Sequence, residues 1–225
     1  MQDQRRTIIV VSAGRAGTDT PSDSLLLGRL PAAAQVVAAD GGIDAALELG
    51  LEVTVAVGDF DSVTSGGLAA VEAAGAHVER HPPEKDATDL ELALDTARTM
   101  GAERIVVVGD PGGRLDHLLA GLLLLGARRY AAIEIDAHLG SATVHIVRAE
   151  RTLAGEPGEL ISLVPLHGPA VGVVTEGLRY PLNGETLGAG SSRGVSNVFT
   201  GPEARVAIAA GVLAAVRPGT ADGSP

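Results

Sequence analysis

The chain has 225 residues, a net charge of −11, no cysteine and only 2% aromatic residues. A chain of this length buries a large core without disulfides, and the lack of cysteine excludes a thiolate metal site. The acidic balance argues against a nucleic-acid partner, which would favour a basic surface. The polar first six residues and the short apolar run at 8–13 resemble neither a signal peptide nor a membrane span. We therefore expect a cytoplasmic protein that makes no contact with a membrane.

Short, continuous apolar runs in the first half of the chain are typical of buried parallel strands. These predicted strands are 7–13, 35–39, 53–57 and 104–108. Stretches with helical character alternate with them, at 43–49, 66–74, 87–100 and 115–127. The alternation indicates βαβ units, so we predict an N-terminal Rossmann-like parallel α/β domain over residues 1–146 that binds a nucleotide.

The pattern changes after about residue 145, where helical periodicity is lost. Short segments rich in valine, isoleucine and leucine then alternate with glycine, proline and asparagine turns at roughly ten-residue spacing. The predicted strands here are 159–165, 170–175, 195–199 and 204–209. We predict a small all-β sandwich domain over residues 147–225, ending in a frayed tail.

Four acidic signatures in the first half of the chain lie where predicted strands run into loops. They are Asp40-Gly41-Gly42, Gly58-Asp-Phe-Asp-Ser62, Lys85-Asp-Ala-Thr-Asp89 and Gly112-Gly-Arg-Leu-Asp-His117. The carboxyl ends of the strands of an open α/β sheet share one crevice, so these motifs can converge on one ligand. Carboxylates beside glycines suit Mg²⁺ that holds a polyphosphate.

The second and third signatures favour metal and phosphate binding, although each has a purely structural alternative. Asp59 and Asp61 are two residues apart and can reach one cation, but an Asp/Ser turn would also explain them. A helix cap would explain Asp86 or Thr88. It leaves Lys85 unexplained, because a cation is disfavoured at a helix N-terminus. Lys85 is the only lysine among seventeen basic residues.

The fourth signature is similar to an anion-binding loop that leads into a helix. Its glycines allow close approach, and Arg114 offers a bidentate fork for phosphate; a glycine-rich turn with a capping acid is the alternative. The sequence lacks GxxxxGK[ST], which argues against a Walker-type NTPase. His77 and His81 precede two prolines and are not expected to hold zinc.

In this order and spacing, the four signatures resemble the thiamin pyrophosphokinase family. The resemblance extends into the second half of the chain at 158–165, 177–182 and 194–199. It implies transfer of a diphosphoryl group from ATP to the hydroxyl of thiamin, giving thiamin diphosphate and AMP, with Mg²⁺ as cofactor. It also implies a homodimer with thiamin bound near the subunit interface.

Position by position, the resemblance assigns roles to individual residues. The acids that surround Mg²⁺ and the phosphates, as metal ligands and catalytic residues, are Asp59, Asp61, Asp86 and Asp89. Arg114 joins them as a catalytic residue that stabilises charge. Residues expected to bind the nucleotide are Asp40, Gly41, Lys85, Thr88, Gly113, Asp116 and His117. Residues expected to line the thiamin pocket are Ser192, Ser196 and Asn197. Asp61 or Asp86 is the predicted acceptor of the hydroxyl proton.

The chain departs from the family pattern at three points, and two other functions are left open. Residues 118–122 lack the asparagine expected after His117, Val198 stands where an acid is expected, and aromatic side chains are few. These departures concern the acceptor more than the acids. One alternative is a diphosphokinase acting on another alcohol, such as a hydroxymethylpterin. The other is a non-catalytic nucleotide-binding protein, against which the paired acids argue.

Overall fold

The computed structural model describes residues 5–12, 27–28, 30–31, 34–109 and 114–219. It shows a mixed α/β protein whose chain divides into two compact units. The first unit comprises Met1–Gly121 and Ala132–Gly140, and the second comprises Leu122–Ala131 and Ser141–Pro225. Each unit has its own sheet structure and is described separately below.

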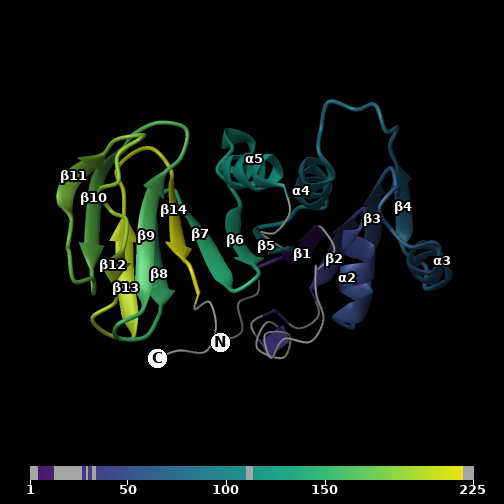
Figure 1. Cartoon of the computed structure of the whole chain (residues 1–225), viewed down its shortest axis with the longest axis horizontal. Helices are drawn as coiled ribbons and strands as arrows, with labels where there is room; N and C mark the ends of the chain where they lie inside the picture. Colours follow the sequence, from purple (N-terminus) through teal and green to yellow (C-terminus); the bar gives the residue numbers. More distant parts are fainter. Residues whose placement is uncertain (1–4, 13–26, 29, 32–33, 110–113, 220–225) are drawn as a thin grey trace. The chain divides into compact units, whose positions relative to one another are not determined.

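The first unit is built on six parallel strands. They are β1 (Thr7–Ser12), β2 (Gln35–Ala39), β3 (Val55–Gly58), β4 (His77–Arg80), β5 (Arg104–Gly109) and β6 (Glu134–Leu139). Their order across the sheet is β6-β5-β1-β2-β3-β4, with parallel pairing throughout. The central strands are buried almost continuously, as expected for a sheet covered on both faces. β1 lies between β2 and β5, where the strand order reverses (Figure 1).

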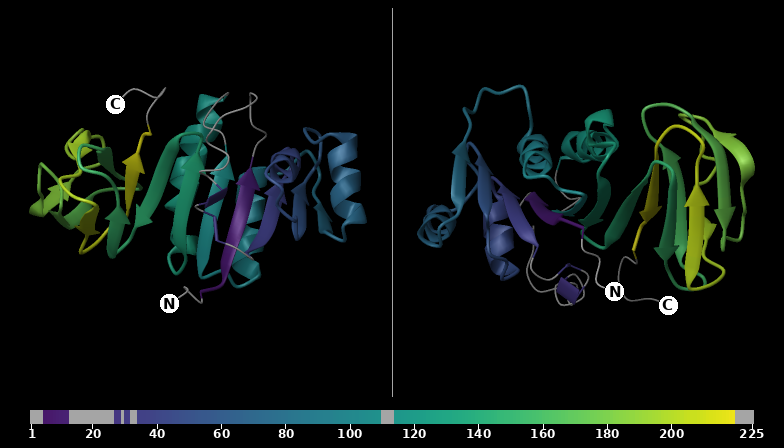
Figure 2. Two further views of the ribbon diagram at one scale, coloured as in Figure 1. Left: turned by 90° about the horizontal axis from the view of Figure 1, so that it is seen from below. Right: turned by 180° about the vertical axis from the view of Figure 1, so that it is seen from behind.

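Four described helices connect these strands. They are α2 (Gly42–Glu48), α3 (Ser65–Ala73), α4 (Asp89–Thr99) and α5 (Leu115–Leu125). The chain moves outward through β2, β3 and β4, then crosses back to β5 and β6. Because such crossovers are right-handed, α2 and α3 lie on one face of the sheet, and α4 and the first half of α5 lie on the other (Figures 1 and 2). None of the helices in the described ranges is long and apolar enough to cross a membrane.

The second unit contains two antiparallel sheets and the short 3₁₀ helix η1 (Arg128–Tyr130). The first sheet has the order β12 (Asn197–Val198), β9 (Leu160–Pro165), β14 (Leu213–Arg217) and β7 (Ala142–Val147). The second has the order β11 (Asn183–Leu187), β10 (Ala170–Glu176), β13 (Glu203–Ala207) and β8 (Glu150–Ala154). Side chains of both sheets form one hydrophobic core, which includes Leu163, Val173 and the fully buried Phe199.

The strands and helices predicted from apolar runs are confirmed to within a few residues at their ends. Thr88 is confirmed as the cap of α4, since its Oγ1 accepts a hydrogen bond of 3.2 Å from the Glu91 N–H. The sequence patterns did not reveal β6, β7 and β14. They also did not reveal β4, β8 and β11, whose sequences are polar and carry no apolar run. All three are edge strands of their unit's sheets, where one side of the strand lacks a neighbour in that sheet and polar residues are tolerated.

Candidate active site

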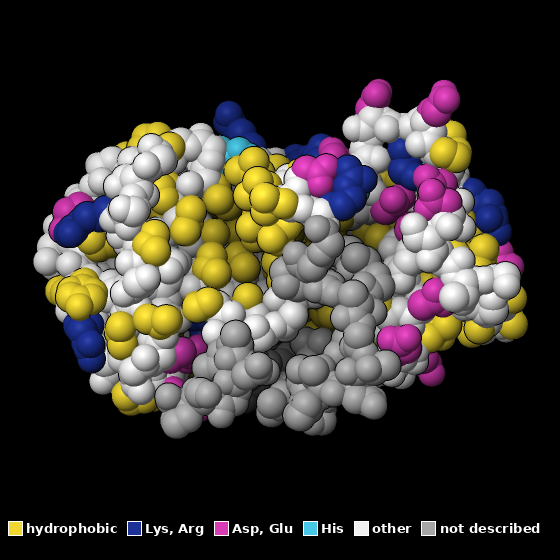
Figure 3. Space-filling model, in the orientation of Figure 1, with side chains coloured by type: hydrophobic (Ala, Val, Ile, Leu, Met, Phe, Trp, Pro, Cys, Tyr) yellow, Lys and Arg dark blue, Asp and Glu magenta, His cyan; other side chains and the backbone are white. Residues whose placement is uncertain are grey.

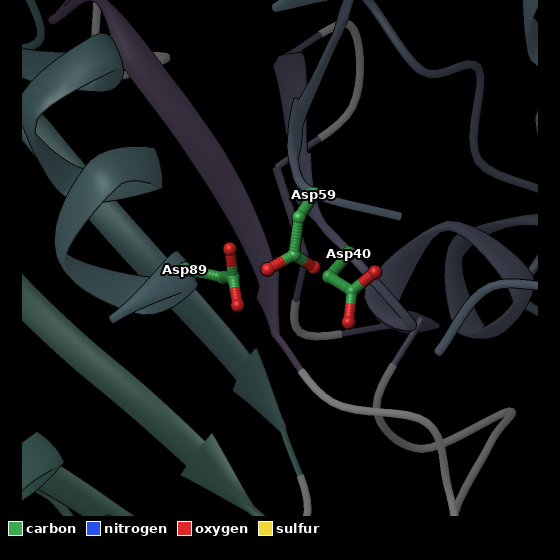
Figure 4. Close-up of side chains that lie close together, drawn as sticks. All are labelled: Asp40, Asp59 and Asp89. Atoms are coloured by element: carbon green, nitrogen blue, oxygen red, sulfur yellow. The ribbon is translucent and has the colours of Figure 1, made fainter. Parts of the chain in front are cut away.

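Three carboxylates meet at the carboxyl edge of the parallel sheet. Asp40 follows β2, Asp59 follows β3, and Asp89 is the first residue of α4. One ligand atom from each lies within 4.8 Å of the other two. Figure 4 shows the carboxylate of Asp59 between those of Asp89 and Asp40. Since β2 and β3 are parallel neighbours, the residues that follow them meet at one edge, and we call these three residues the acid cluster.

Unusual backbone conformations hold the acid cluster together. Asp40 has φ of 44° and Phe60 has φ of 63°, both in the left-handed region that non-glycine residues seldom adopt. Gly58, between β3 and Asp59, has φ of 148°. A Cβ at Gly58 would lie 3.1 Å from Asp89 Oδ1 and 3.2 Å from Asp40 Cβ. Backbone strain of this kind concentrates at functional sites, where surrounding structure maintains it.

Replacing Gly58 with alanine is expected to lower the free energy of unfolding by about 1–3 kcal/mol, the usual cost of an unfavourable backbone conformation. The added methyl group would also push Asp89 away from Asp40. Urea unfolding measures the loss. Gly66→Ala is the matched control, because a Cβ at that position would meet nothing within 4 Å and alanine is favoured in a helix. Equal stabilities for the two variants would contradict the prediction.

Lys85 supplies the cation that faces the acid cluster. Its Nζ lies 2.7 Å from Asp59 Oδ2 and 2.9 Å from Asp89 Oδ1, and its side chain is only 12% exposed. The hydrogen bond from Lys85 lowers the pKa of Asp59. Burial alone would lower the pKa of Lys85, but its contacts with Asp59 and Asp89 outweigh burial and raise it. Lys85 and Asp59 are therefore both charged at neutral pH.

The carboxylates of Asp89 and Asp40 are less completely hydrogen-bonded than that of Asp59. Asp89 Oδ1 is buried, and none of the described groups, Lys85 Nζ included, gives it a well-directed hydrogen bond. Asp40 is 8% exposed, and its Oδ1 accepts a long hydrogen bond of 3.4 Å from the Ser62 N–H. Burial raises the pKa of Asp40, and the nearby charge of Asp89 adds to this effect. The acid cluster thus carries more negative charge than Lys85 neutralises.

The raised pKa of Asp40 predicts how stability depends on pH. Between the ordinary pKa of 3.8 and the raised value, the folded protein binds more protons than the unfolded chain, so stability falls as pH rises through this window. Asp40→Asn removes the charge and keeps a residue that tolerates positive φ. We expect its Tm in metal-free buffer at pH 7 to rise by about 2–4 °C, the effect of about 1 kcal/mol in a chain of this size.

Calorimetry in the presence of a chelator, at pH 7 and below pH 3.8, tests this prediction. The advantage of Asp40→Asn should disappear at the lower pH, where Asp40 is protonated in both the folded and the unfolded state. A Tm at pH 7 below that of the unaltered protein would contradict it.

Two of the acids predicted as metal ligands lie outside the acid cluster. Asp61 is exposed and accepts a 2.8 Å hydrogen bond from Ser62 Oγ, and Asp86 is also exposed. Residues two apart reach one cation most readily from an extended chain, whereas the left-handed conformation of Phe60 turns the chain between Asp59 and Asp61. The roles of Asp61 and Asp86 stay predictions.

The predicted phosphate-binding loop is described only from Arg114 onward, and Gly113 lies outside the described residues. Arg114 forms a bidentate ion pair with Asp116, through Nε at 3.2 Å and Nη2 at 2.6 Å. These hydrogen bonds lower the pKa of Asp116 to about 2. His117 is exposed in the first turn of α5. Gly41, predicted to contact the nucleotide, caps the N-terminus of α2.

The predicted thiamin-pocket residues belong to the second unit. Ser192 is exposed, and Ser196, with φ of 57°, donates its N–H to Ser162 Oγ at 3.0 Å. Asn197 is buried, and both the oxygen and the nitrogen of its side-chain amide bond to the backbone. Its Oδ1 accepts from the N–H groups of Tyr180 and Val198, and its Nδ2 donates to the Tyr180 carbonyl.

Two features of the acid cluster were not predicted from the sequence. The sequence places Asp40 with the nucleotide-binding residues, and the structure also brings it beside Asp59 and Asp89. A signal for this was present, because Asp40 directly follows a predicted strand that neighbours the strand before Asp59. The bridge that Lys85 forms between Asp59 and Asp89 was also missed, and its only sequence signal was a lone lysine in an acidic motif.

Comparison with known proteins supports one family for both halves of the chain. Residues 29–135 match the family model "Thiamin pyrophosphokinase, catalytic domain", and residues 143–213 match "Thiamin pyrophosphokinase, vitamin B1 binding domain". The thiamine pyrophosphokinase of Bacillus subtilis is 29% identical over 183 residues, covering 80% of this chain and 86% of that protein.

Solved structures of proteins with this family's name share the fold. The thiamine pyrophosphokinase of Bacillus subtilis superposes with a TM-score of 0.80 at 27% identity, covering 95% of this chain and 99% of that one. The thiamin pyrophosphokinase of Geobacillus thermodenitrificans gives a TM-score of 0.77 at 26% identity, covering 96% and 99%. This chain belongs to the thiamin pyrophosphokinase family.

Proposed function

We infer that this protein transfers a diphosphoryl group from ATP to the hydroxyl of thiamin, giving thiamin diphosphate and AMP. The observation that carries this inference is the match to both domains of the family, the catalytic domain at 29–135 and the vitamin B1 binding domain at 143–213. An acid cluster with a facing lysine lies within the catalytic match. Neither a pterin diphosphokinase nor a non-catalytic nucleotide-binding protein is favoured, because each would leave the vitamin-binding match unexplained.

We assign the nucleotide chemistry to a Rossmann-like domain over residues 1–146, and thiamin binding and dimerisation to a β-sandwich over residues 147–225. The parallel strand order with its reversal between β1 and β5 supports the first assignment. The hydrophobic core shared by two antiparallel sheets supports the second.

The acid cluster fits Mg²⁺. Oxygen ligands from carboxylates are those that Mg²⁺ takes in proteins, together with phosphate oxygens and water. Three carboxylates converge, one buried oxygen of Asp89 lacks a well-directed hydrogen bond, and Asp40 is only weakly compensated. Asp40, Asp59 and Asp89 would hold the ion, with Asp61 and Asp86 close by in sequence. Bound there, Mg²⁺ would neutralise charge on the phosphates of ATP.

The chain's own residues position and neutralise the reacting groups. Phosphoryl-type transfer depends on in-line positioning and charge stabilisation more than on covalent catalysis. Arg114 offers a guanidinium fork to phosphate oxygens once it leaves Asp116. The proton of the thiamin hydroxyl needs an acceptor, and Asp59 is a weak base because Lys85 lowers its pKa. This leaves the exposed Asp61 and Asp86 as the candidates.

Thiamin binding is assigned to the loop at Ser192, Ser196 and Asn197. The amide of Asn197 is already bonded to the backbone of Tyr180 and Val198, so its contribution is to hold that loop in place. Ser192 and Ser196 are exposed and can contact a ligand directly. Tyr180 is 60% exposed, whereas Tyr130 and Phe199 are buried.

We extend the proposal to a homodimer whose contact includes the outer face of the sheet containing β9. Leu160 and Val164 on this strand are 47% and 37% exposed, and Figure 3 shows hydrophobic side chains over β9 and β14. Exposed apolar patches of this kind mark interaction sites. Sedimentation equilibrium would then give about twice the chain mass of 22.6 kDa. A monomer at micromolar concentration would contradict the dimer.

AMP release from ATP and Mg²⁺, with and without thiamin, tests the function. We expect AMP only when thiamin is present, and a product heavier than thiamin by two phosphoryl groups. The same assay with hydroxymethylpterin in place of thiamin distinguishes the proposed enzyme from a pterin diphosphokinase. ATP binding without AMP release for either acceptor would contradict the proposed function.

A further inference from the structure

The contacts of Lys85 indicate how the site changes when Mg²⁺ and the nucleotide bind. This inference rests on the proposed function. Lys85 is the only lysine of the chain, and it lies in the segment between β4 and α4. It reaches Asp59 at 2.7 Å and Asp89 at 2.9 Å, so its ammonium bridges two of the three acids. The bridge is largely shielded from water, since the lysine is 12% exposed and Asp59 is 11% exposed.

A divalent cation in the acid cluster would compete with Lys85 for the carboxylates of Asp59 and Asp89. Carboxylates that ligate one Mg²⁺ directly bring their oxygens to about 2.0–2.1 Å from the ion, which leaves no room for an ammonium between them. Two cations sharing the same carboxylates in a poorly hydrated site also repel each other strongly. Direct metal ligation through Asp59 Oδ2 and Asp89 Oδ1, the oxygens that Lys85 contacts, is therefore incompatible with the lysine bridge.

The lysine bridge also leaves part of the hydrogen bonding and the charge of the acid cluster unsatisfied. Asp89 Oδ1 receives no well-directed hydrogen bond from it, and burial of the Asp40 carboxylate raises the pKa of that group. A lysine ammonium sits on a flexible four-carbon stem and donates in three directions, so it can leave and re-form contacts at little cost. An arginine fork would hold two carboxylates more rigidly.

We propose that Lys85 is a resident counter-cation that holds Asp59 and Asp89 in place until Mg²⁺ enters with the nucleotide, and that the ion displaces its ammonium from both carboxylates. Before loading, the lysine prevents like-charge repulsion from opening the acid cluster. After loading, the released ammonium has three donors free for phosphate oxygens. Lys85 thus has two positions, one for the free enzyme and one for the loaded enzyme.

A single lysine makes the displacement directly observable. Protein labelled with lysine carrying ¹³C at Cε gives one side-chain signal, from Lys85. The signal is followed by NMR while Mg²⁺ is added, first alone and then with α,β-methylene-ATP, which cannot undergo the transfer. We expect it to move toward the position of a mobile lysine as the cation binds, and to move again when the analogue supplies phosphates.

Cation affinity in variants provides the second measurement, with Mn²⁺ as the probe, detected by electron paramagnetic resonance. If the lysine bridge occupies the site in most molecules, only the small remaining fraction can bind Mn²⁺. Removing the bridge then raises the apparent affinity for Mn²⁺ by a factor of one divided by that fraction. On this basis we expect Lys85→Gln to bind Mn²⁺ about tenfold more tightly than the unaltered protein, and Lys85→Arg to bind it more weakly. Arg98→Gln, which removes an exposed cation of α4, is the control and should change nothing.

The outcomes separate this inference from the proposed metal site. An unchanged Lys85 signal while the cation binds, or equal Mn²⁺ affinities for Lys85→Gln and the unaltered protein, overturns the displacement but keeps the metal site. Cation binding that survives Asp59→Asn overturns both, since the acid cluster would not be the site. Should Lys85→Gln not fold, the NMR titration of the unaltered protein decides the question alone.

Discussion

Asp59→Asn is expected to lower kcat for thiamin-dependent AMP release by about 10³-fold or more, while the fold is kept. Asp59 lies at the centre of the site, where it faces the other two acids and takes the hydrogen bond of Lys85. Asparagine has the same shape but lacks the charge that attracts Mg²⁺. Metal-assisted charge stabilisation is worth several kcal/mol, and about 4 kcal/mol corresponds to a thousandfold change in rate.

Steady-state assays of AMP release measure this loss, and circular dichroism verifies the fold. Asp95→Asn is the matched control, because Asp95 is a surface acid of α4 that pairs with Arg98 away from the acid cluster. The control should keep activity within about twofold, since surface changes of this kind have small effects. Activity of Asp59→Asn within tenfold of the unaltered protein would show that the acid cluster is not the reaction site.

The overall fold was accessible from sequence because its strongest signals are local. Buried parallel strands such as β1 and β5 consist of unbroken apolar residues, and helix α4 begins at a threonine cap. These patterns depend on a residue's neighbours along the chain, so they can be recognised without knowledge of the tertiary structure. Strands β8 and β11 carry no such pattern, because their polar residues fit only once a neighbouring strand and the shared core are in place.

The candidate site was accessible only in part, because it depends on which side chains turn inward. The sequence places Asp59 and Asp61 equally well beside a metal, whereas the structure brings Asp59 into the acid cluster and has the left-handed backbone of Phe60 between the two. A positive φ at a phenylalanine has no sequence signature, since bulky residues rarely adopt it. The bridge from Lys85 to Asp59 spans 26 residues, and no pattern of local spacing reveals it.

The two acidic motifs around Asp59 and Lys85 show why convergence, not motif content, defines this site. Each motif alone is compatible with a turn or a helix cap, and Thr88 does cap α4. The neighbouring positions of β2 and β3 bring Asp40 and Asp59 together, and the crossover to α4 adds Asp89. Fold topology therefore supplies the information that separates the functional interpretation from the structural one.

Arg114→Gln is expected to lower kcat/KM for ATP by about 10²-fold, and Arg114→Lys by more than about tenfold. The guanidinium forms two parallel bonds to Asp116 and can form the same pair with phosphate oxygens, whereas lysine acts as a point charge. Loss of one charge-stabilising donor typically costs about 10²–10³-fold. AMP release as a function of ATP concentration measures both variants, and Arg129→Gln on η1 is the control cation.

The ion pair between Arg114 and Asp116 also predicts that the charges of the two side chains do not change with pH in the range used for assays. Arg114 holds the pKa of Asp116 at about 2, so the pair keeps its charges throughout the range in which the enzyme can be assayed. Stability from this pair would be lost only as pH falls through that low value, and the exposure of both side chains keeps it small. Asp116→Asn should therefore shift ATP affinity equally at about pH 6 and about pH 8, since Asp116 is ionised at both. A shift that changes between these two pH values would show that another titrating group, not Asp116, controls Arg114.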